Sequence, residues 1–364
     1  MEIPETIMTM PELTLDNSVK NGSSFCVTLN RGGVTDKFVN QSPKQYLMAV
    51  RDASVAWIDF TTKELEKEIE IIGPSMGFQK IDYPKIFSGF YSSYEDYDDE
   101  LGIMLPAVAM TDEDIMVRPI IILIKGNIIV TVHNEDINRL LRFSRYAQPF
   151  LKKLNADNTP DSITLVLERI IDENNDRNFE FLRGIEAHGD SISKALIEEK
   201  MGRQQIARDI YNMKHILINY LNVLWATKDV TESLRYGDSD LITDDEHLLG
   251  RIGILSNNID RHIELSEQMS TVLASGLEVM QSIYNNQLQN LNNRFALVTA
   301  YLTVLGTAFL VPNTIATIAG SGVMGGTMGE QWWYVPLLAL STVVATVVSF
   351  LWVLHVWKRR KDDM

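Results

Sequence analysis

The chain has 364 residues, with 48 acidic against 33 basic side chains and a formal net charge of −15. This length is sufficient for two or three domains with a buried core, so a disordered chain and a small disulfide-stapled scaffold are both excluded. The single cysteine, Cys26, allows neither a disulfide framework nor a cysteine-based zinc site, and the acidic balance argues against a nucleic-acid partner.

Residues 24–150 alternate between short apolar segments and turns, which is typical of a mixed α/β domain. The apolar segments predict strands at residues 25–29, 55–60, 86–91, 104–110, 118–124 and 128–133. The last two are rich in β-branched residues and are joined by Lys125-Gly126-Asn127, a good hairpin turn. A helix is expected over residues 62–72. We therefore place a first domain at residues 1–155.

Three long helices are predicted after this domain, at residues 162–199, 202–232 and 244–291, because apolar side chains recur there at helical spacing. The third helix has neither a proline nor another stop signal before Arg294, where an uncharged segment begins. This pattern predicts one continuous helix that enters the uncharged segment. Two separate helices with a break at Asn292-Asn293 are the alternative. Residues 156–294 form the predicted stalk.

Two segments, residues 295–329 and 331–357, contain no Asp, Glu, Lys or Arg. Each exceeds the ~20 apolar residues with which a helix crosses a bilayer, so residues 295–364 are predicted to form two transmembrane helices. Tryptophans flank the second segment, and the basic residues 358–361 follow it. The positive-inside rule then places both termini in the cytoplasm of a cell-membrane protein. The first 17 residues lack a basic segment, so no secretory signal is expected.

Polar and small apolar side chains recur at heptad spacing before and inside the first span. In an isolated helix this stripe has no purpose, but in a symmetric ring of helices it lines a central conduit with amide oxygens, hydroxyl groups and an apolar constriction. Ordinary helix packing is the alternative. The predicted pore-lining residues are Asn286, Asn290, Asn293, Leu297, Val304, Thr307, Val311 and Thr314.

Acidic side chains gather between Glu95 and Glu100, where carboxylate oxygens suit a hard cation. A regulatory metal site between subunits is one interpretation, with Asp96, Asp98, Asp99 and Asp260 as its ligands. A solvated loop is the other. Residues 320–325 spell the dinucleotide pattern G-x-G-x-x-G, but they follow a span rather than a strand. No catalytic motif is found, so we expect neither an enzyme nor an organic cofactor.

The order of these parts resembles the CorA family of divalent-cation channels. Residues 55–60 (VAWIDF) are similar to the VxWIDL strand of that family, and residues 125–133 are similar to its GKNYLLTVH hairpin. Residues 207–225 resemble its paired stalk helices, and residues 309–314 (FLVPNT) resemble FMPLT in its pore helix. The chain departs from the family pattern in one respect: the G-M-N signature that follows the first span in that family is missing here.

The resemblance implies a CorA-like funnel, with an α+β cytoplasmic domain, a long-helix stalk and two C-terminal transmembrane helices. It implies a homopentamer in a lipid bilayer that conducts Mg²⁺, or Co²⁺ and Ni²⁺, passively and is gated by intracellular divalent ions. A proton-driven Zn²⁺ transporter of the ZntB branch and a non-transporting scaffold or sensor are the alternatives. Without the signature Asn, we expect a pore mouth of backbone carbonyls with an attracting carboxylate, built by Gly322, Val323, Met324 and Glu330.

Overall fold

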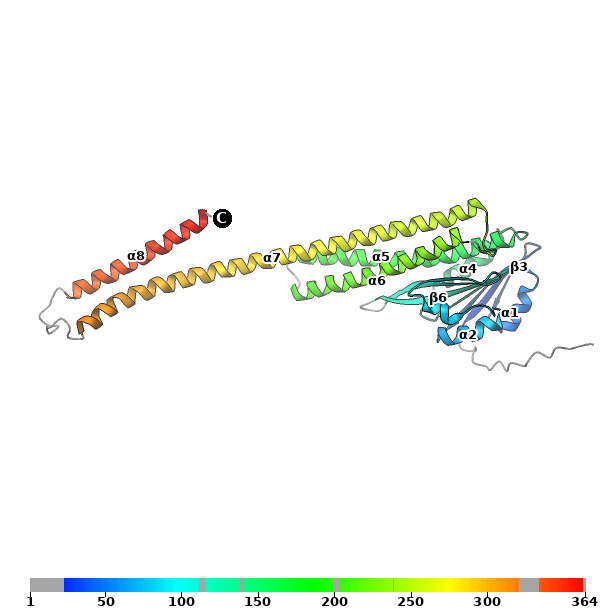
Figure 1. The fold of residues 1–364 in the computed structure, drawn as a ribbon, viewed down its shortest axis with the longest axis horizontal. Helices are drawn as coiled ribbons and strands as arrows, with labels where there is room; N and C mark the ends of the chain where they lie inside the picture. Colours follow the sequence, from blue (N-terminus) through cyan, green and yellow to red (C-terminus); the bar gives the residue numbers. More distant parts are fainter. Residues whose placement is uncertain are drawn as a thin grey trace, which may run out of the picture. The chain divides into compact units, whose positions relative to one another are not determined.

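The structure is a computed structural model that describes residues 23–110, 115–137, 140–198, 203–237, 239–320 and 334–362. Figure 1 shows the helices and strands of the chain, coloured along the sequence. The chain divides into two compact units, one that ends at Leu277 and one that begins at Glu278. The predicted pore mouth, at Gly322, Val323, Met324 and Glu330, lies outside the described residues.

A mixed sheet forms the centre of the first unit. Its strand order in the described part of the chain is β2-β1-β3-β7-β6-β5-β4. Among the strands of the described residues, β3 and β7 pair in parallel and the other neighbours are antiparallel. The β6–β7 hairpin turns at Gly126, whose φ of +54° suits glycine. The strands are β1 (Ser24–Asn30), β2 (Thr35–Val39), β3 (Ala53–Thr62), β4 (Ser93–Asp96), β5 (Leu101–Met110), β6 (Ile115–Lys125) and β7 (Ile128–Asn134).

Helices cover both faces of this sheet, so its central strands are buried on either side. Helices α1 (Pro43–Val50), α2 (Leu65–Ser75) and α3 (Tyr83–Ser88) lie on one face, where Ile58 joins the apolar core. The other face packs against α4 (Leu140–Leu151), α5 (Thr159–Glu198) and α6 (Arg203–Tyr236). There Trp57, the neighbour of Ile58 in β3, stacks on Phe143 of α4 with 4.5 Å between ring centres.

Helix α7 (Glu246–Gly320) is continuous over 75 residues and begins in the first unit. It runs through Asn292 and Asn293 without interruption, so the prediction of one continuous helix is confirmed and the alternative of a break is wrong. Pro312 lies inside it and does not end it. Near its start, Ile252, Leu255 and Ile259 are buried against the rest of the first unit.

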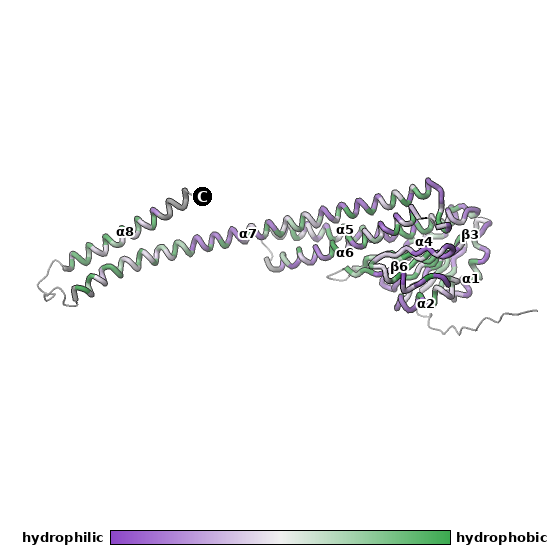
Figure 2. Tube along the Cα trace, viewed as in Figure 1, coloured by the Kyte–Doolittle hydropathy of each residue, from purple (hydrophilic) through white to green (hydrophobic). Residues whose placement is uncertain are grey.

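The second unit contains the last part of α7 and helix α8 (Tyr334–Asp362). Both are long and apolar enough to cross a membrane, with mean hydropathies of 1.9 and 2.4 in their most apolar windows. Figure 2 shows the hydrophobic colouring along both helices. The predicted α+β domain, long helix and two apolar C-terminal helices are thus confirmed.

The prediction was wrong at residues 86–91, where a strand was expected. Helix α3 occupies the first part of this segment, because the carboxylate of Asp82 accepts the backbone N–H of Lys85 at 3.2 Å and Pro84 stands in the first helical turn. Helix α2 starts at Leu65 rather than at residue 62, because Thr62 still pairs with Asn134 of β7. Strands β2 and β4 and helices α1 and α4 were not predicted.

Candidate functional site

The eight predicted pore-lining residues all belong to α7, on either side of the point where its charged residues end. Asn286, Asn290 and Asn293 are exposed on the helix surface. At 100° per residue, Thr307, Val311 and Thr314 lie within about 60° of one another around the helix. These side chains therefore share one uncharged stripe, as predicted from their spacing.

One member of this stripe contacts the second apolar helix. The hydroxyl oxygens of Thr307 and of Ser349 in α8 lie 2.7 Å apart, which is a hydrogen bond between the two helices. Val304 and Thr307 are half-buried, whereas Thr314 is exposed and Val311 is 39% exposed. Within one chain, the Thr307 edge of the stripe thus takes part in helix packing, while Val311 and Thr314 remain available to a neighbouring molecule or to solvent.

The threonine hydroxyls of the stripe bond to their own helix. Thr307 donates to the carbonyl oxygens of Thr303 and Val304, both at 3.0 Å, and Thr314 donates to Leu310 at 2.8 Å. Such back-bonding satisfies a hydroxyl proton in an apolar environment. The remaining oxygen lone pairs and the absence of charge suit a cation that keeps its water shell.

The predicted acidic cluster is the hairpin turn between β4 and β5, and lysines neutralise much of it. Glu95 pairs with Lys85, and Asp99 pairs with Lys80. Asp96 accepts the backbone N–H of Asp98 at 3.0 Å, and Asp98 has a φ of +66°. The side chains of these two aspartates remain exposed.

Glu100, at the end of this turn, is completely buried and fully satisfied. Its carboxylate accepts Lys125 Nζ at 2.8 Å and the backbone N–H groups of Gln79 and Lys80 at 3.1 and 2.9 Å. Burial by itself raises the pKa of this carboxyl group, but these donors outweigh burial and hold the pKa below 4.5. Glu100 therefore fixes the loop before α3 to the sheet.

Asp260, the fourth candidate metal ligand, lies on α7 and accepts Lys228 Nζ of α6 at 2.7 Å. It is thus held by a lysine in the same way as Asp99. Among the described residues, no group of three or more His, Cys, Asp or Glu side chains converges as a metal site within one chain.

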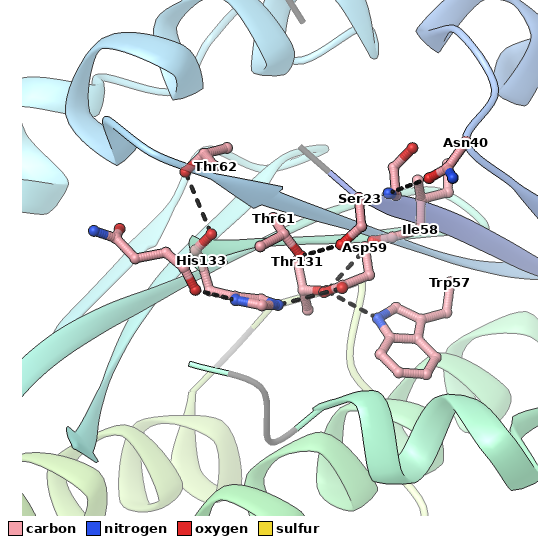
Figure 3. A network of polar contacts seen from close by, with 11 residues as sticks. Ser23, Asn40, Trp57, Ile58, Asp59, Thr61, Thr62, Thr131 and His133 are labelled. Atoms are coloured by element: carbon pink, nitrogen blue, oxygen red, sulfur yellow. Dashed lines mark hydrogen bonds and ion pairs between the residues drawn. The ribbon is translucent and has the colours of Figure 1, made fainter. Parts of the chain in front are cut away.

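A buried polar network crosses β3 and β7 on the face that packs against α4 and α5 (Figure 3). Thr131 donates to Asp59 Oδ1 and accepts Trp57 Nε1 at 3.1 Å. His133 Nε2 lies 3.3 Å from Asp59 Oδ2, and its Nδ1 lies 2.9 Å from the carbonyl oxygen of Asn134. Both ring nitrogens therefore face acceptors, which favours the protonated imidazolium.

The environment of His133 decides its charge. Burial lowers the pKa of the imidazole, but the Asp59 carboxylate outweighs this effect and raises the pKa above 6.5. Asp59 stands beside Thr131 in the parallel register, so the network fixes the pairing of the two central strands. Sequence reasoning found these residues only as parts of family motifs. The signal that they carry is the placement of polar residues in otherwise apolar, buried strands.

The comparison with protein families decides the identity of the chain. The model of the CorA-like Mg²⁺ transporter proteins matches residues 52–360, which include most of the sheet, the long helices and both apolar helices. The chain belongs to the CorA-like Mg²⁺ transporter family. Membership of this family supports divalent-cation transport at a membrane rather than enzymatic catalysis.

Solved structures agree with this CorA-like fold. The CorA magnesium transporter from Methanocaldococcus jannaschii has a TM-score of 0.68 and 18% identity, over 90% of this chain and 96% of that one. The full-length CmaX protein has a TM-score of 0.59 and 15% identity, over 92% and 98% of the two chains. The ZntB cytoplasmic domain from Vibrio parahaemolyticus RIMD 2210633 has a TM-score of 0.52 and 14% identity, over 72% and 98%. No curated protein sequence matches this chain.

Proposed function

We propose that this chain forms a Mg²⁺ channel, with Co²⁺ and Ni²⁺ as further permeant ions. The observation that carries the proposal is the family match, which extends from the sheet through both apolar helices. The uncharged stripe of α7 supports a passive conduit for a hydrated divalent ion. In this proposal residues 1–155 are the cytoplasmic domain, residues 156–294 the stalk and residues 295–364 the transmembrane domain.

Self-association is part of the proposal, because two helices in one hairpin do not enclose a path for an ion. Apolar side chains seven residues apart are exposed along α6 and along α7. A ring of copies buries such stripes against one another. They consist of Tyr211, Ile218 and Trp225 on α6, and of Leu265, Val272 and Val279 on α7, with exposed fractions between 43% and 69%. We propose a homopentamer, as the family resemblance implies.

The proposed conduction path uses hydration rather than direct ligands. Mg²⁺ gives up its water reluctantly, so amide and hydroxyl oxygens of the stripe hold it through its water shell. Val311 forms the apolar constriction, which excludes ions when it is dry. At the mouth, backbone carbonyls around Gly322 with Val323 and Met324 replace the missing Asn, and a ring of Glu330 side chains attracts cations. Glu330→Gln should lower flux at low Mg²⁺ concentration and change it little at saturation.

We propose that intracellular divalent ions close the channel by binding between cytoplasmic domains. The exposed carboxylates of Asp96 and Asp98, with Asp99 and Asp260, are the proposed ligands. A bound cation offsets the repulsion between acidic subunits and thereby favours the closed ring. Replacing Asp96, Asp98 and Asp99 by Asn should leave a channel that Mg²⁺ no longer closes. Unchanged inhibition by Mg²⁺ in this variant would leave the hairpin as a solvated loop.

Flux through liposomes tests the proposal against its alternatives. Mg²⁺ entry that needs no pH gradient supports the channel. Zn²⁺ entry that occurs only in the presence of a proton gradient contradicts the channel. It favours the second candidate function, a Zn²⁺ transporter, which is supported by the similarity to the ZntB cytoplasmic domain. The absence of any divalent flux supports a membrane scaffold. Thr314→Lys, which places a fixed positive charge on the stripe, is the control and should abolish flux without dissociating the oligomer.

We also propose that both termini are cytoplasmic, because the basic residues 358–361 directly follow the second span. Cysteines at Thr327 and Asp363, in a Cys26→Ser background, should then react with impermeant reagents from opposite sides of the membrane. Reaction of both from the outside would contradict this topology.

A further inference from the structure

A cavity lined by three cations lies in the first unit, and none of its lining residues belongs to the sites considered above. Its volume is about 360 Å³, and its walls come from α4, from Lys153 just after α4, from α5 and from the start of α7. The lining residues are Tyr146, Pro149, Phe150, Lys153, Arg169 and Arg251. Three of the six are cations and none is acidic, in a protein whose net charge is −15.

Carboxylates behind the lining hold the two arginines in place. Arg169 bonds to Asp172 at 2.6 Å and to Glu173, and Arg251 Nη2 bonds to Glu168 at 2.9 Å. None of these carboxylates lines the cavity. Because these three carboxylates outnumber the two guanidinium groups, an anion in the cavity depends strongly on the third cation.

That third cation is Lys153, which is exposed and has no ionic partner in the part of the chain that the structure describes. Arg251 also keeps Nε and Nη1 without a bond to another described residue, so donors from two elements remain for a ligand. Charge-assisted bonds to phosphate oxygens are the interaction for which such groups are best suited.

Two aromatic rings complete the cavity. Tyr146 and Phe150 are four residues apart and therefore lie on one side of α4. Phe150 is held edge-on against Phe143, with 5.4 Å between ring centres, and Tyr146 Oη accepts Arg169 Nη2 at 2.6 Å. An aromatic ring beside cations suits a ligand that joins a neutral planar ring to negatively charged groups.

We propose that this cavity binds a nucleoside triphosphate in its metal-free form. A volume of about 360 Å³ exceeds what one phosphate ion fills and lies within the range of organic-ligand sites. The cations bind the phosphate oxygens, and Phe150 stacks on the base. Since Mg²⁺ occupies the same phosphate oxygens in a metal complex, the cavity favours the nucleotide that remains when Mg²⁺ is scarce. This site goes beyond the proposed transport and does not depend on it.

Calorimetric titration of the full-length protein in detergent with ATP, in the presence of EDTA, tests the proposal without any measurement of flux. Saturable binding is expected, and excess Mg²⁺ should weaken it. Lys153→Glu should weaken ATP binding about tenfold or more. Lys152→Glu is the matched control, because it makes the same charge change at an exposed neighbour that does not line the cavity. Its effect should stay within about twofold.

Tripolyphosphate is the second probe, since it has the phosphates without the base. Phe150→Leu should weaken ATP binding about fivefold or more and leave tripolyphosphate binding nearly unchanged. Absence of saturable ATP binding, or an equal loss in the two lysine variants, would overturn the site. Tripolyphosphate binding as tight as that of ATP would overturn the recognition of a base.

Discussion

The buried pair of Glu100 and Lys125 provides the sharpest test of how the acidic hairpin is built. In Glu100→Gln the side chain keeps its shape and loses its charge. One amide oxygen then replaces two carboxylate oxygens that accept from Gln79, Lys80 and Lys125. Wherever that oxygen turns, the new NH₂ group faces a donor. At least one buried donor is left without an acceptor.

The size of the expected loss in stability follows from the burial of the two side chains. A buried donor without an acceptor costs about 1–3 kcal/mol, and breaking a buried ion pair costs about 3–5 kcal/mol. Glu100 is 0% exposed, but the side chain of Lys125 is 37% exposed and regains water. We therefore expect Glu100→Gln to lower the free energy of unfolding by about 2–4 kcal/mol. Lys125→Met should cost more, because it leaves a carboxylate buried without its counter-charge.

Pulsed hydrogen exchange at increasing urea concentration measures this loss in the full-length protein in detergent. Peptides from residues 101–125 report on β5 and β6. If the free energy of unfolding falls by about 2 kcal/mol per molar urea, the urea concentration at the midpoint of unfolding should be lower by about 1–2 M in Glu100→Gln. Asp98→Asn is the matched control, since Asp98 belongs to the same turn and is exposed. Its midpoint should change little.

The pH dependence and the response to Mg²⁺ complete this test. Because the folded pKa of Glu100 is below 4.5, its ionised form contributes stability above that pH, and the contribution is lost as the pH falls through the folded pKa. The difference between the wild type and Glu100→Gln should therefore shrink in acid. An unchanged midpoint in Glu100→Gln would refute the assigned bonds. Stabilisation by Mg²⁺ that disappears in this variant would show that Glu100 binds metal instead of Lys125.

Three further predictions concern the second unit and the sheet. Val311→Ser should raise basal Mg²⁺ flux, whereas Ile315→Ser, which lies about 100° around α7 from Thr314, should matter less; equal effects would show that the stripe is wrongly phased. The raised pKa of His133 stabilises the fold below pH 6.5, and this stability is lost as the pH rises through the folded pKa. Hydrogen exchange in β7 should therefore speed up over that range, but not in His133→Asn. Thr307→Val should lower the thermal stability by about 0.5–1 kcal/mol through its lost bond to α8; a change in flux alone would place this side chain at the pore.

Local signals explain which parts of the fold were predictable. The β6–β7 hairpin needed only two β-branched segments and Gly126, and α7 needed only the absence of a stop signal. Strands β2 and β4 are short, lie at the two edges of the sheet and keep most side chains partly exposed, so they have no clear apolar alternation. At residues 86–91, apolar side chains suggested a strand, although Asp82 and Pro84 already formed a helix start.

At the candidate site, contacts between residues far apart in the sequence could not be predicted. The heptad spacing predicted a shared stripe on α7, but the bond between Thr307 and Ser349 depends on how α8 packs against it. The acidic turn was visible as a cluster of charges. That Lys80, Lys85 and Lys125 neutralise three of its members follows only from the packing of α3 and the segment before it against β4 and β5, and from the pairing of β5 with β6.

The hydrogen bonds of the threonine side chains in α7 bear on whether a pore lined by this helix admits cations or anions. Thr314 donates its hydroxyl proton to the backbone carbonyl of Leu310 and leaves its oxygen lone pairs exposed. Thr307 also donates to its own helix, but its oxygen lies against Ser349 of α8. In the proposed ring of such helices, the Thr314 side chains therefore contribute acceptors. The water around a metal ion would point its hydrogens at these oxygens, whereas chloride needs donors to replace its water. Discrimination against anions then requires no charged residue inside the membrane.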